Sequence, residues 1–407
     1  MFIIHPVVLV ALLFLLSAPA SLYAQGYSVA FKNFAEEVVF EQALNGFYQL
    51  QGATLKVQLA PRLIVKVARQ TTNAELMTWA PDATQITDLF LMQQYRYVLL
   101  HFTENAQALQ ALDKLQQQPL ITLVQPDLQQ QRMKAASLLG DVTEQDLSLP
   151  FYLRLAQNKG LWPGRGGAGV TVAVIDDGFA LQHPEFSQLH TRFYYDFSSK
   201  KIVNAGVSID GVVGQHGTMI AGILFGAHNR KLPEGLVPNA DFVGISQADT
   251  WTSHTLQSFY LAYLAKADVI NCSWHTQWLL EPVQDVVDEL SRYGRGGKGA
   301  AVIFAAGNEG QHIEARMHEA SISSAIVVGA NNTEGMPLKF SNFGGFVDFW
   351  AFGGPVISAA HNQDYSYFSG TSLAAAITTG YVALLLERDP SLSSAQLQSQ
   401  LKQLTVE

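Results

Sequence analysis

A serine at the start of an apolar, helix-like segment is the residue of this chain best suited to act as a nucleophile. Ser372 follows the small-residue turn Gly370-Thr371 and precedes residues 373–387, which have the length and apolar character of a helix. Backbone N–H groups at a helix start are unpaired and lie at the positive end of the helix dipole, so they stabilise a developing negative charge. A hydroxyl beside such donors can attack a carbonyl carbon. The simpler interpretation is a serine that only caps a buried helix.

Three further polar residues stand where an apolar run meets a glycine-containing turn. Asp176 ends the β-branched run at 170–175, His216 begins a turn that opens a second helix, and Asn308 follows the apolar run that starts at residue 300. Each has a common structural interpretation: a cap for the aspartate, a packing role for the histidine and a turn for Asn-Glu-Gly. Only the combination of these three residues with Ser372 indicates a catalytic site.

Together the four side chains supply every role that an acyl-transfer site needs. Ser372 is the nucleophile, His216 the base, Asp176 the orienting carboxylate and Asn308 the oxyanion donor. In an open α/β sheet, such residues gather at the carboxyl ends of the strands. The sequence therefore predicts one hydrolytic site assembled from four distant segments.

The order Asp, His, Asn, Ser resembles that of the subtilisin-like serine proteases, or subtilases. The resemblance spans about residues 150–405 and is carried by the motifs VAVIDDG (172–178), HGTMIAG (216–222), AAGNEG (305–310) and SGTSLAA (369–375). It implies a serine endopeptidase in which Ser372 attacks the peptide carbonyl, His216 transfers the proton and Asp176 orients the imidazole. The Asn308 amide and the Ser372 backbone N–H would then hold the oxyanion.

The same resemblance implies that two short segments line the substrate groove and pair with an extended substrate. They are Ser273, Trp274 and His275 on one side and Ala305, Ala306 and Gly307 on the other. Trp274 is bulky, and His275 stands where the family has a glycine that lets the substrate backbone approach. We therefore expect an altered or narrowed entrance to the pocket for the residue before the cleaved bond, unless a loop shift accommodates both side chains.

No cofactor is expected for this chemistry. The residues at 225–237 do not resemble the long calcium-binding loop of some relatives, and a calcium site elsewhere has no support in the sequence. A single cysteine, Cys272, excludes both an internal disulfide and a structural zinc site built from cysteines.

The elements that must position the site form an α/β pattern from Trp162 onward. Apolar strand-like runs at 170–175, 242–245, 269–270, 300–304 and 325–328 alternate with helix-like segments at 218–224, 253–265 and 282–293. Short buried strands separated by helices predict a parallel sheet covered on both faces. The resemblance implies more: a subtilisin-like three-layer sandwich with a mainly parallel central sheet, preceded by a small α+β propeptide domain.

The part that precedes this pattern is rich in glutamine and poor in glycine, and it predicts a small unit of its own. Strands are expected at 61–69, 95–102 and 120–124, the last stopped by Pro126, with a helix at 106–117 capped by Thr103. By resemblance this unit is a subtilase propeptide, which assists folding and inhibits the groove within the same molecule. The expected division is propeptide and connector at 25–140 and peptidase domain at 141–407, with processing within 128–147.

Residues 1–24 have the pattern of a secretory signal peptide. The apolar run at 7–16 is shorter than the ~20 residues that a membrane span needs, and cleavage is expected near Ala20 or Ala24. An uncleaved anchor is the alternative. We therefore expect a secreted protein, either extracellular or periplasmic.

Composition limits the partners. Only 14% of the 407 residues are charged, well below the ~25% of typical soluble domains, and 48% are hydrophobic, which suits a compact buried sheet. The net charge of −9 gives no electrostatic reason to expect nucleic acid. We expect a monomer without a stable membrane span, whose partners are polypeptide substrates and its own propeptide.

The leading hypothesis is a secreted serine endopeptidase made as a self-inhibited precursor. One alternative is a non-catalytic subtilase-fold binding module, which Trp274 and His275 in the groove would favour. The other is a peptide-maturation or esterase-like hydrolase of narrow specificity. A fluorophosphonate probe separates enzyme from binding module, because only an activated serine reacts with it.

Overall fold

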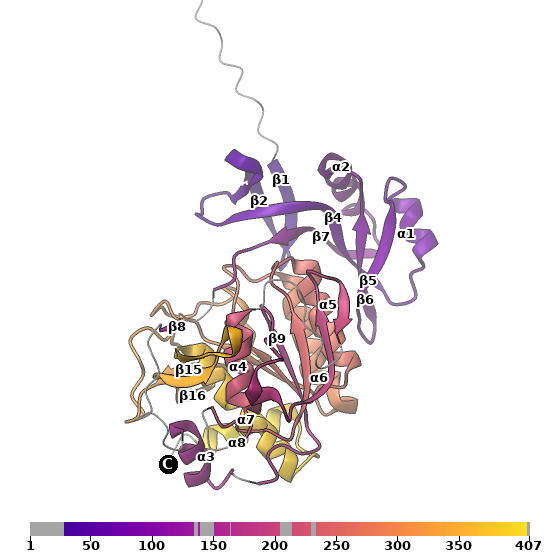
Figure 1. Ribbon diagram of the computed structural model, residues 1–407. Helices are drawn as coiled ribbons and strands as arrows, with labels where there is room; N and C mark the ends of the chain where they lie inside the picture. Colours follow the sequence, from indigo (N-terminus) through magenta and orange to yellow (C-terminus); the bar gives the residue numbers. More distant parts are fainter. Residues whose placement is uncertain are drawn as a thin grey trace, which may run out of the picture.

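The computed structural model describes residues 28–133, 137–138, 150–162, 164–203, 214–228 and 233–404. These residues form a large C-terminal unit around a central sheet and a smaller N-terminal unit (indigo to purple in Figure 1) built on a sheet of its own.

The central sheet has eight strands in the order β11-β10-β12-β9-β13-β14-β15-β16, and every neighbouring pair except β10–β11 is parallel. Its strands are β9 (Thr171–Asp176), β10 (His190–Asp196), β11 (Lys201–Val203), β12 (Asp241–Ser246), β13 (Val269–Cys272), β14 (Ala301–Ala305), β15 (Ile326–Asn331) and β16 (Phe349–Phe352). The expectation of a mainly parallel sheet in an α/β fold is confirmed.

Helices cover both faces of this sheet, as continuous apolar strands require. They are α3 (Phe151–Asn158), α4 (Gln215–Phe225), α5 (Thr252–Leu264), α6 (Glu281–Gly297, with non-helical backbone at Gly294, Arg295 and Gly296), α7 (Thr371–Arg388) and α8 (Ser394–Leu404). Along β9, Val172 and Val174 belong to the core with α4 and α7, whereas Ala173 and Ile175 belong to the core with α5 and α6. The result is three layers (Figure 1).

The N-terminal unit is a seven-stranded antiparallel sheet in the order β1-β2-β3-β4-β6-β5, with β7 added to β4. Its elements are β1 (Ser28–Asn33), β2 (Glu36–Gln42), β3 (Tyr48–Leu50), β4 (Lys56–Ala68), α1 (Asn73–Trp79), β5 (Gln85–Leu91), β6 (Tyr95–His101), α2 (Asn105–Leu115) and β7 (Ile121–Gln129). The strands expected at 61–69 and 95–102 are present, but four strands and one helix of this unit went unpredicted.

Two local expectations for this unit were wrong. Strand β7 continues through Pro126 to Gln129, because Pro126 pairs with Leu63 of β4 next to an irregularity in register, where the missing N–H is tolerated. Helix α2 is capped by Glu104 and not by Thr103.

The N-terminal unit packs on α5 and α6 (Figure 1). The two units share one cluster of buried hydrophobic side chains. At the end of β7, the Asp127 carboxylate accepts hydrogen bonds from the Ser253 backbone N–H (2.9 Å) and hydroxyl (2.7 Å), at the N-terminus of α5. Asp285 of α6 accepts from Tyr97 (2.5 Å) and forms a 2.5 Å ion pair with Lys66. The contact therefore combines apolar burial with polar pairs across the boundary.

A third, three-stranded sheet lies beside α4. It consists of β17 (Val356–Ala359), β18 (Tyr365–Phe368) and β8 (Ser137–Leu138), all antiparallel. Strand β8 follows the N-terminal unit in sequence, and β18 immediately precedes the turn to Ser372. The chain that leaves the N-terminal unit is thereby tied to the C-terminal unit.

Candidate active site

Asp176 and His216 form a buried pair at the carboxyl end of the central sheet. Asp176 is the last residue of β9, and His216 is the second residue of α4. His216 Nδ1 lies 2.9 Å from Oδ1 and 3.0 Å from Oδ2 of Asp176, whose side chain is fully buried. Since Nδ1–H donates to the carboxylate, Nε2 is the nitrogen that can accept a proton.

Ser372 lies in the first turn of α7, where the preceding Gly370 adopts a φ of 111° that favours glycine. The Ser372 hydroxyl donates to the Ser273 carbonyl oxygen at 2.8 Å, and the Ser273 hydroxyl donates back to the Ser372 carbonyl at 3.0 Å. Among the described residues, His216 Nε2 is buried and has no hydrogen-bond partner. The serine hydroxyl is therefore held against the groove wall and does not donate to the imidazole in this state.

Asn308 is held in a fixed orientation beside the start of α7. Its Oδ1 accepts from the backbone N–H (2.9 Å) and the hydroxyl (3.1 Å) of Thr371, the residue before Ser372. The Thr371 hydroxyl in turn accepts from the Gly307 N–H at 3.2 Å. With Oδ1 occupied, the Asn308 Nδ2 hydrogens remain as donors for an oxyanion. Thr371, which the sequence reasoning did not single out, links this asparagine to the serine.

The groove next to these residues holds a segment of the same chain. Met133 and His275 form an antiparallel bridge, with the Met133 N–H donating to the His275 carbonyl (2.8 Å) and the His275 N–H donating back (3.3 Å). On the opposite wall, Gln129 bridges Trp251, and the Thr252 hydroxyl donates to the Leu128 carbonyl at 3.0 Å. The end of β7 and the residues after it thus lie between two extended edges of the C-terminal unit.

The chain is held again on the other side of the reactive residues. The backbone of Ser137 pairs with Phe368, and that of Leu138 with Tyr367. The Phe368 ring stands edge-on to His216, with ring centroids 5.7 Å apart. Met133 is therefore anchored at His275, and Ser137 is anchored at Phe368, whose ring contacts His216; residues 134–136 lie outside the described residues.

The predicted groove residues divide into two groups. Ser273 and His275 contact Ser372 and the bound segment. The backbone of Ala306 is instead used within the fold, because its N–H donates to Val328 and its carbonyl accepts from Asn342. Ala305 belongs to β14, and Gly307 donates its N–H to Thr371.

Gly307 is covered by two charged side chains. A Cβ at Gly307 would lie 2.6 Å from Glu309 Oε2 and 2.8 Å from His275 Nε2, and these two atoms form a 3.4 Å ion pair. The His275 ring also stacks on His318, with centroids 4.2 Å apart. Glu309 and His318 carried no signal in the sequence, because their importance comes only from contact with His275.

The pKa values in this cluster follow from burial and from charge. Burial lowers the pKa of His275, but its hydrogen bonds and the Glu309 carboxylate outweigh burial and raise it. Burial raises the pKa of Glu309, and His275 reverses this and lowers it to about 2. Burial and then the charge of His275 lower the pKa of His318 to about 3. The raised pKa of His275 and the lowered pKa of Glu309 therefore favour an ion pair, and the lowered pKa of His318 favours a neutral ring beside it.

Trp274 does not face the same space as His275. Its indole is buried, donates from Nε1 to the Ile175 carbonyl at 2.7 Å, and carries the Arg132 guanidinium on its face. The structure thus places the two unusual groove residues in two different pockets.

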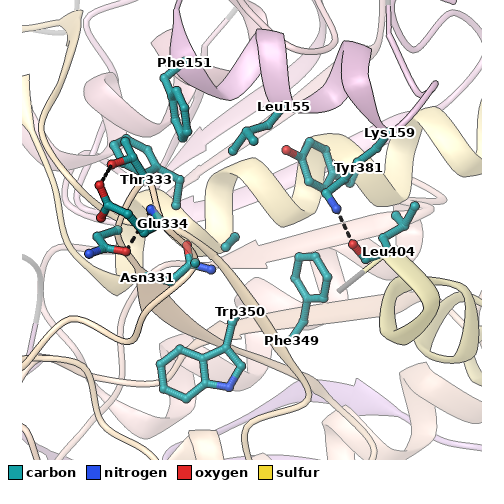
Figure 2. Close-up of a pocket in the computed structure, with 14 residues that line it drawn as sticks. Phe151, Leu155, Lys159, Asn331, Thr333, Glu334, Phe349, Trp350, Tyr381 and Leu404 are labelled. Atoms are coloured by element: carbon teal, nitrogen blue, oxygen red, sulfur yellow. Dashed lines mark hydrogen bonds between the residues drawn. The ribbon is translucent and has the colours of Figure 1, made fainter. Parts of the chain in front are cut away.

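Figure 2 shows a separate cavity of about 260 Å³ between α3, β16 and α7, lined by none of the predicted site residues. Phe151, Phe349, Trp350 and Tyr381 supply much of its wall, and Lys159 Nζ donates to the Leu404 carbonyl. The lining of this cavity combines aromatic and polar side chains and includes none of the four candidate reactive residues.

The described part of the chain contains no group of three or more His, Cys, Asp or Glu side chains that could hold a metal ion. Among the helices of the described ranges, none has the length and apolar content needed to cross a membrane. Cys272 is buried and unbridged, as expected from its being the single cysteine.

Comparison with known proteins gives consistent matches. The model of the Subtilase family matches residues 167–406. The minor extracellular protease Epr of Bacillus subtilis is 28% identical over 62% of this chain and 37% of its own length. A thermophilic serine proteinase of a Bacillus species (strain AK1) is 32% identical over 54% of this chain and 53% of its own length. The chain thus spans about half the length of these relatives.

A solved structure agrees on the fold. The crystal structure of fervidolysin from Fervidobacterium pennivorans, a keratinolytic enzyme related to subtilisin, covers 92% of this chain and 59% of its own, with a TM-score of 0.67 at 18% identity. At this identity the likeness concerns the fold alone.

Proposed function

Because this chain belongs to the subtilase family, we propose that it is a secreted serine endopeptidase, made as a precursor whose N-terminal unit blocks its own groove. The observations that carry the proposal are the buried Asp176–His216 pair, the link from Asn308 to Thr371 at the start of α7, and the pairing of Met133 with His275 in the groove. The signal peptide predicted at 1–24 lies outside the described residues. It remains a prediction, as do the boundaries at 25–140 and 141–407.

The proposed reaction uses the four residues in turn. Ser372 Oγ attacks the peptide carbonyl carbon while its proton passes to His216 Nε2, and Asp176 stabilises the resulting imidazolium. Asn308 Nδ2–H and the Ser372 backbone N–H hold the oxyanion. Collapse of the tetrahedral intermediate breaks the C–N bond, and the leaving amine takes the proton from Nε2. Water, deprotonated by His216, then releases the acyl group from Ser372.

The Ser372 hydroxyl must change its partner before this reaction can begin. It now donates to the Ser273 carbonyl, and attack requires that it donate to His216 Nε2. We expect a rotation of the serine side chain to make this change, because catalytic hydrogen bonds commonly tighten only when substrate is correctly placed. We expect this rotation to accompany productive binding of a scissile bond.

Self-processing is expected between Met133 and Ser137. The chain is paired with one wall of the groove at Met133 and with β18 at Ser137, and we place the processed bond in the interval between these two anchors. This narrows the interval of 128–147 expected from the sequence.

The test is the fate of the purified precursor. Wild-type protein should convert to a shorter form whose new N-terminus lies within residues 134–137, and the form should react with a fluorophosphonate probe. The Ser372→Ala protein should stay full-length and unlabelled. The Ser187→Ala protein, changed at an exposed serine that is not one of the four candidate reactive residues, should behave as wild type. A folded wild-type protein that neither processes nor reacts would support a binding module instead.

A further inference from the structure

A charged side chain of the groove-bound segment is almost completely buried in the C-terminal unit. The Arg132 side chain belongs to a residue that is only 9% exposed. Its Nη1 donates to the Gln247 carbonyl at 2.9 Å, its Nη2 donates to Gln247 Oε1 at 2.6 Å, and its guanidinium carbon lies 3.6 Å from the centroid of the Trp274 ring. A planar, delocalised cation suits both contacts, since it can donate twice and stack on an aromatic face.

The pocket is held in shape by its own residues. Gln247 follows β12, and its backbone N–H donates to the Asp176 carbonyl at 2.7 Å. Its side-chain Nε2 donates to Thr255 Oγ1 (2.9 Å) and to the Trp251 carbonyl (3.2 Å), which leaves Oε1 facing the guanidinium. None of these contacts needs Arg132, so the acceptor should stay in place when the segment leaves.

The aromatic wall is equally fixed. Trp274 is tied to the Ile175 carbonyl by Nε1, and its ring packs edge-on against Phe304 with centroids 5.6 Å apart. Burial lowers the pKa of Arg132, and the nearby acidic side chains of Asp176, Glu319 and Asp249 oppose that effect. The surroundings thus oppose the loss of the positive charge that burial alone would favour.

Arg132 reaches this pocket in the way a substrate side chain would. The neighbouring Met133 pairs with His275 in an antiparallel bridge, and Gln129 pairs with Trp251. Any extended polypeptide that pairs with the same two edges would present a side chain at the same place. The pocket therefore belongs to the groove and not to the interface of the N-terminal sheet with α5 and α6.

We propose that Trp274 and Gln247 form a subsite that selects an arginine side chain in the substrate, on the amino-terminal side of the cleaved bond. The preferred substrates are polypeptides in which an arginine is followed, one to four residues later, by the bond that is cut. This inference rests on the proposed function and narrows it to a protease of restricted specificity. In the precursor of this chain, Arg132 is the arginine that occupies this subsite.

The direct test uses the processed wild-type enzyme, with active sites counted by the fluorophosphonate probe. The substrates are fluorogenic peptides with the sequence of residues 129–138. Replacing the arginine by alanine should lower kcat/KM about 10- to 100-fold, as expected for the loss of charge-assisted hydrogen bonds. A peptide with lysine at this position should have a kcat/KM between those of the arginine and alanine peptides. The matched control replaces Gln131, whose side chain is exposed, by alanine and should change kcat/KM less than about twofold.

The pocket should also be tested from the enzyme side. Trp274→Leu removes the aromatic face, so the ratio of kcat/KM for the arginine and alanine peptides should fall towards one. Equal rates for the two peptides on wild-type enzyme that reacts fully with the probe would overturn the subsite while leaving the protease proposal intact.

A second measurement does not depend on catalysis. In the full-length Ser372→Ala precursor, Arg132→Ala should speed cleavage within residues 128–138 by added thermolysin, whereas Gln131→Ala should not. Unchanged protection would overturn the subsite even if the protein proved inactive. Faster cleavage, together with a wild-type protein that does not react with the probe, would support an arginine-binding groove and refute the protease.

Discussion

Two histidine–carboxylate pairs line the same groove, and they differ in which ring nitrogen faces the carboxylate. His216 turns Nδ1 to Asp176, and its Nε2 has no hydrogen bond among the described residues. His275 donates Nδ1–H to the Thr276 carbonyl at 2.7 Å, and its Nε2, which also lacks a hydrogen bond among these residues, lies 3.4 Å from Glu309 Oε2. The first arrangement leaves a nitrogen that can accept a proton, and the second favours an imidazolium that is held as a cation.

The carboxylates differ as well. Asp176 is fully buried at the end of a central strand, whereas the Glu309 side chain is 27% exposed on the loop after β14. A buried carboxylate with a fixed partner orients a ring, while a partly exposed one contributes mainly charge. The same two residue types therefore serve proton transfer in one place and the shape and charge of the groove in the other.

The largest expected effect separates the two histidines. His216→Ala should reduce the rate of precursor self-processing by about 10⁶-fold, the size known for a catalytic histidine in a subtilisin, because His216 is the proposed base. His275→Ala should change that rate by less than about tenfold, since its backbone pairing with Met133 survives. Conversion of the purified precursor, followed by mass spectrometry, measures both rates. Similar losses of processing rate in the two variants would contradict the assignment of proton transfer to His216 and not to His275.

An intermediate effect should separate the two carboxylates. Asp176→Asn should slow processing by about 10⁴-fold, because the amide no longer stabilises the imidazolium and favours the tautomer with a proton on Nε2. Glu309→Gln should slow it by less than about tenfold. Both variants must first show the far-UV circular dichroism of the wild type. A Glu309→Gln enzyme as impaired as Asp176→Asn would place Glu309 in the proton-transfer machinery.

The smallest effect concerns pH and stability. The pKa of Glu309 falls to about 2 in the folded protein, so its charge adds stability above its ordinary value near 4.5 that is lost as pH falls towards 2. The pKa of His275 is raised, so its charge adds stability below its ordinary value near 6.5 that is lost as pH rises through the raised pKa. The ion pair therefore contributes most between about pH 4.5 and 6.5.

Urea unfolding of the Ser372→Ala precursor, which should not cleave itself, tests this window. Glu309→Gln should lower the free energy of unfolding by less than about 1 kcal/mol between pH 4.5 and 6.5, because the carboxylate is partly exposed. The difference should shrink at pH 3. Separately, the pKa of His318 falls to about 3, so both proteins should lose stability as pH falls below 6.5. A difference that is independent of pH would argue against the ion pair.

Local patterns determined much of the C-terminal unit. Apolar runs of strand length predicted β9, β12, β13, β14 and β15 to within a few residues, because a strand buried on both faces needs continuous apolar side chains. The Ser-x-x-Gln pattern that begins at Ser393 is typical of a capping box, and the structure has one: the Ser393 N–H donates to Gln396 Oε1 at 2.8 Å and the Gln396 N–H donates back to Ser393 Oγ at 3.3 Å. Motif order was enough to select four candidate reactive residues from their types and positions.

The sequence by itself therefore determined the family, the parallel sheet and the identity of the candidate reactive residues, all of which depend on short-range pattern. Only the tertiary structure decided that Arg132 enters the groove, that Gln247 receives it and that Glu309 pairs with His275. The residues around Arg132 are polar and have no periodicity, and its partners lie more than a hundred positions away. Such contacts arise where segments distant in the sequence meet in the groove, and no local pattern encodes them.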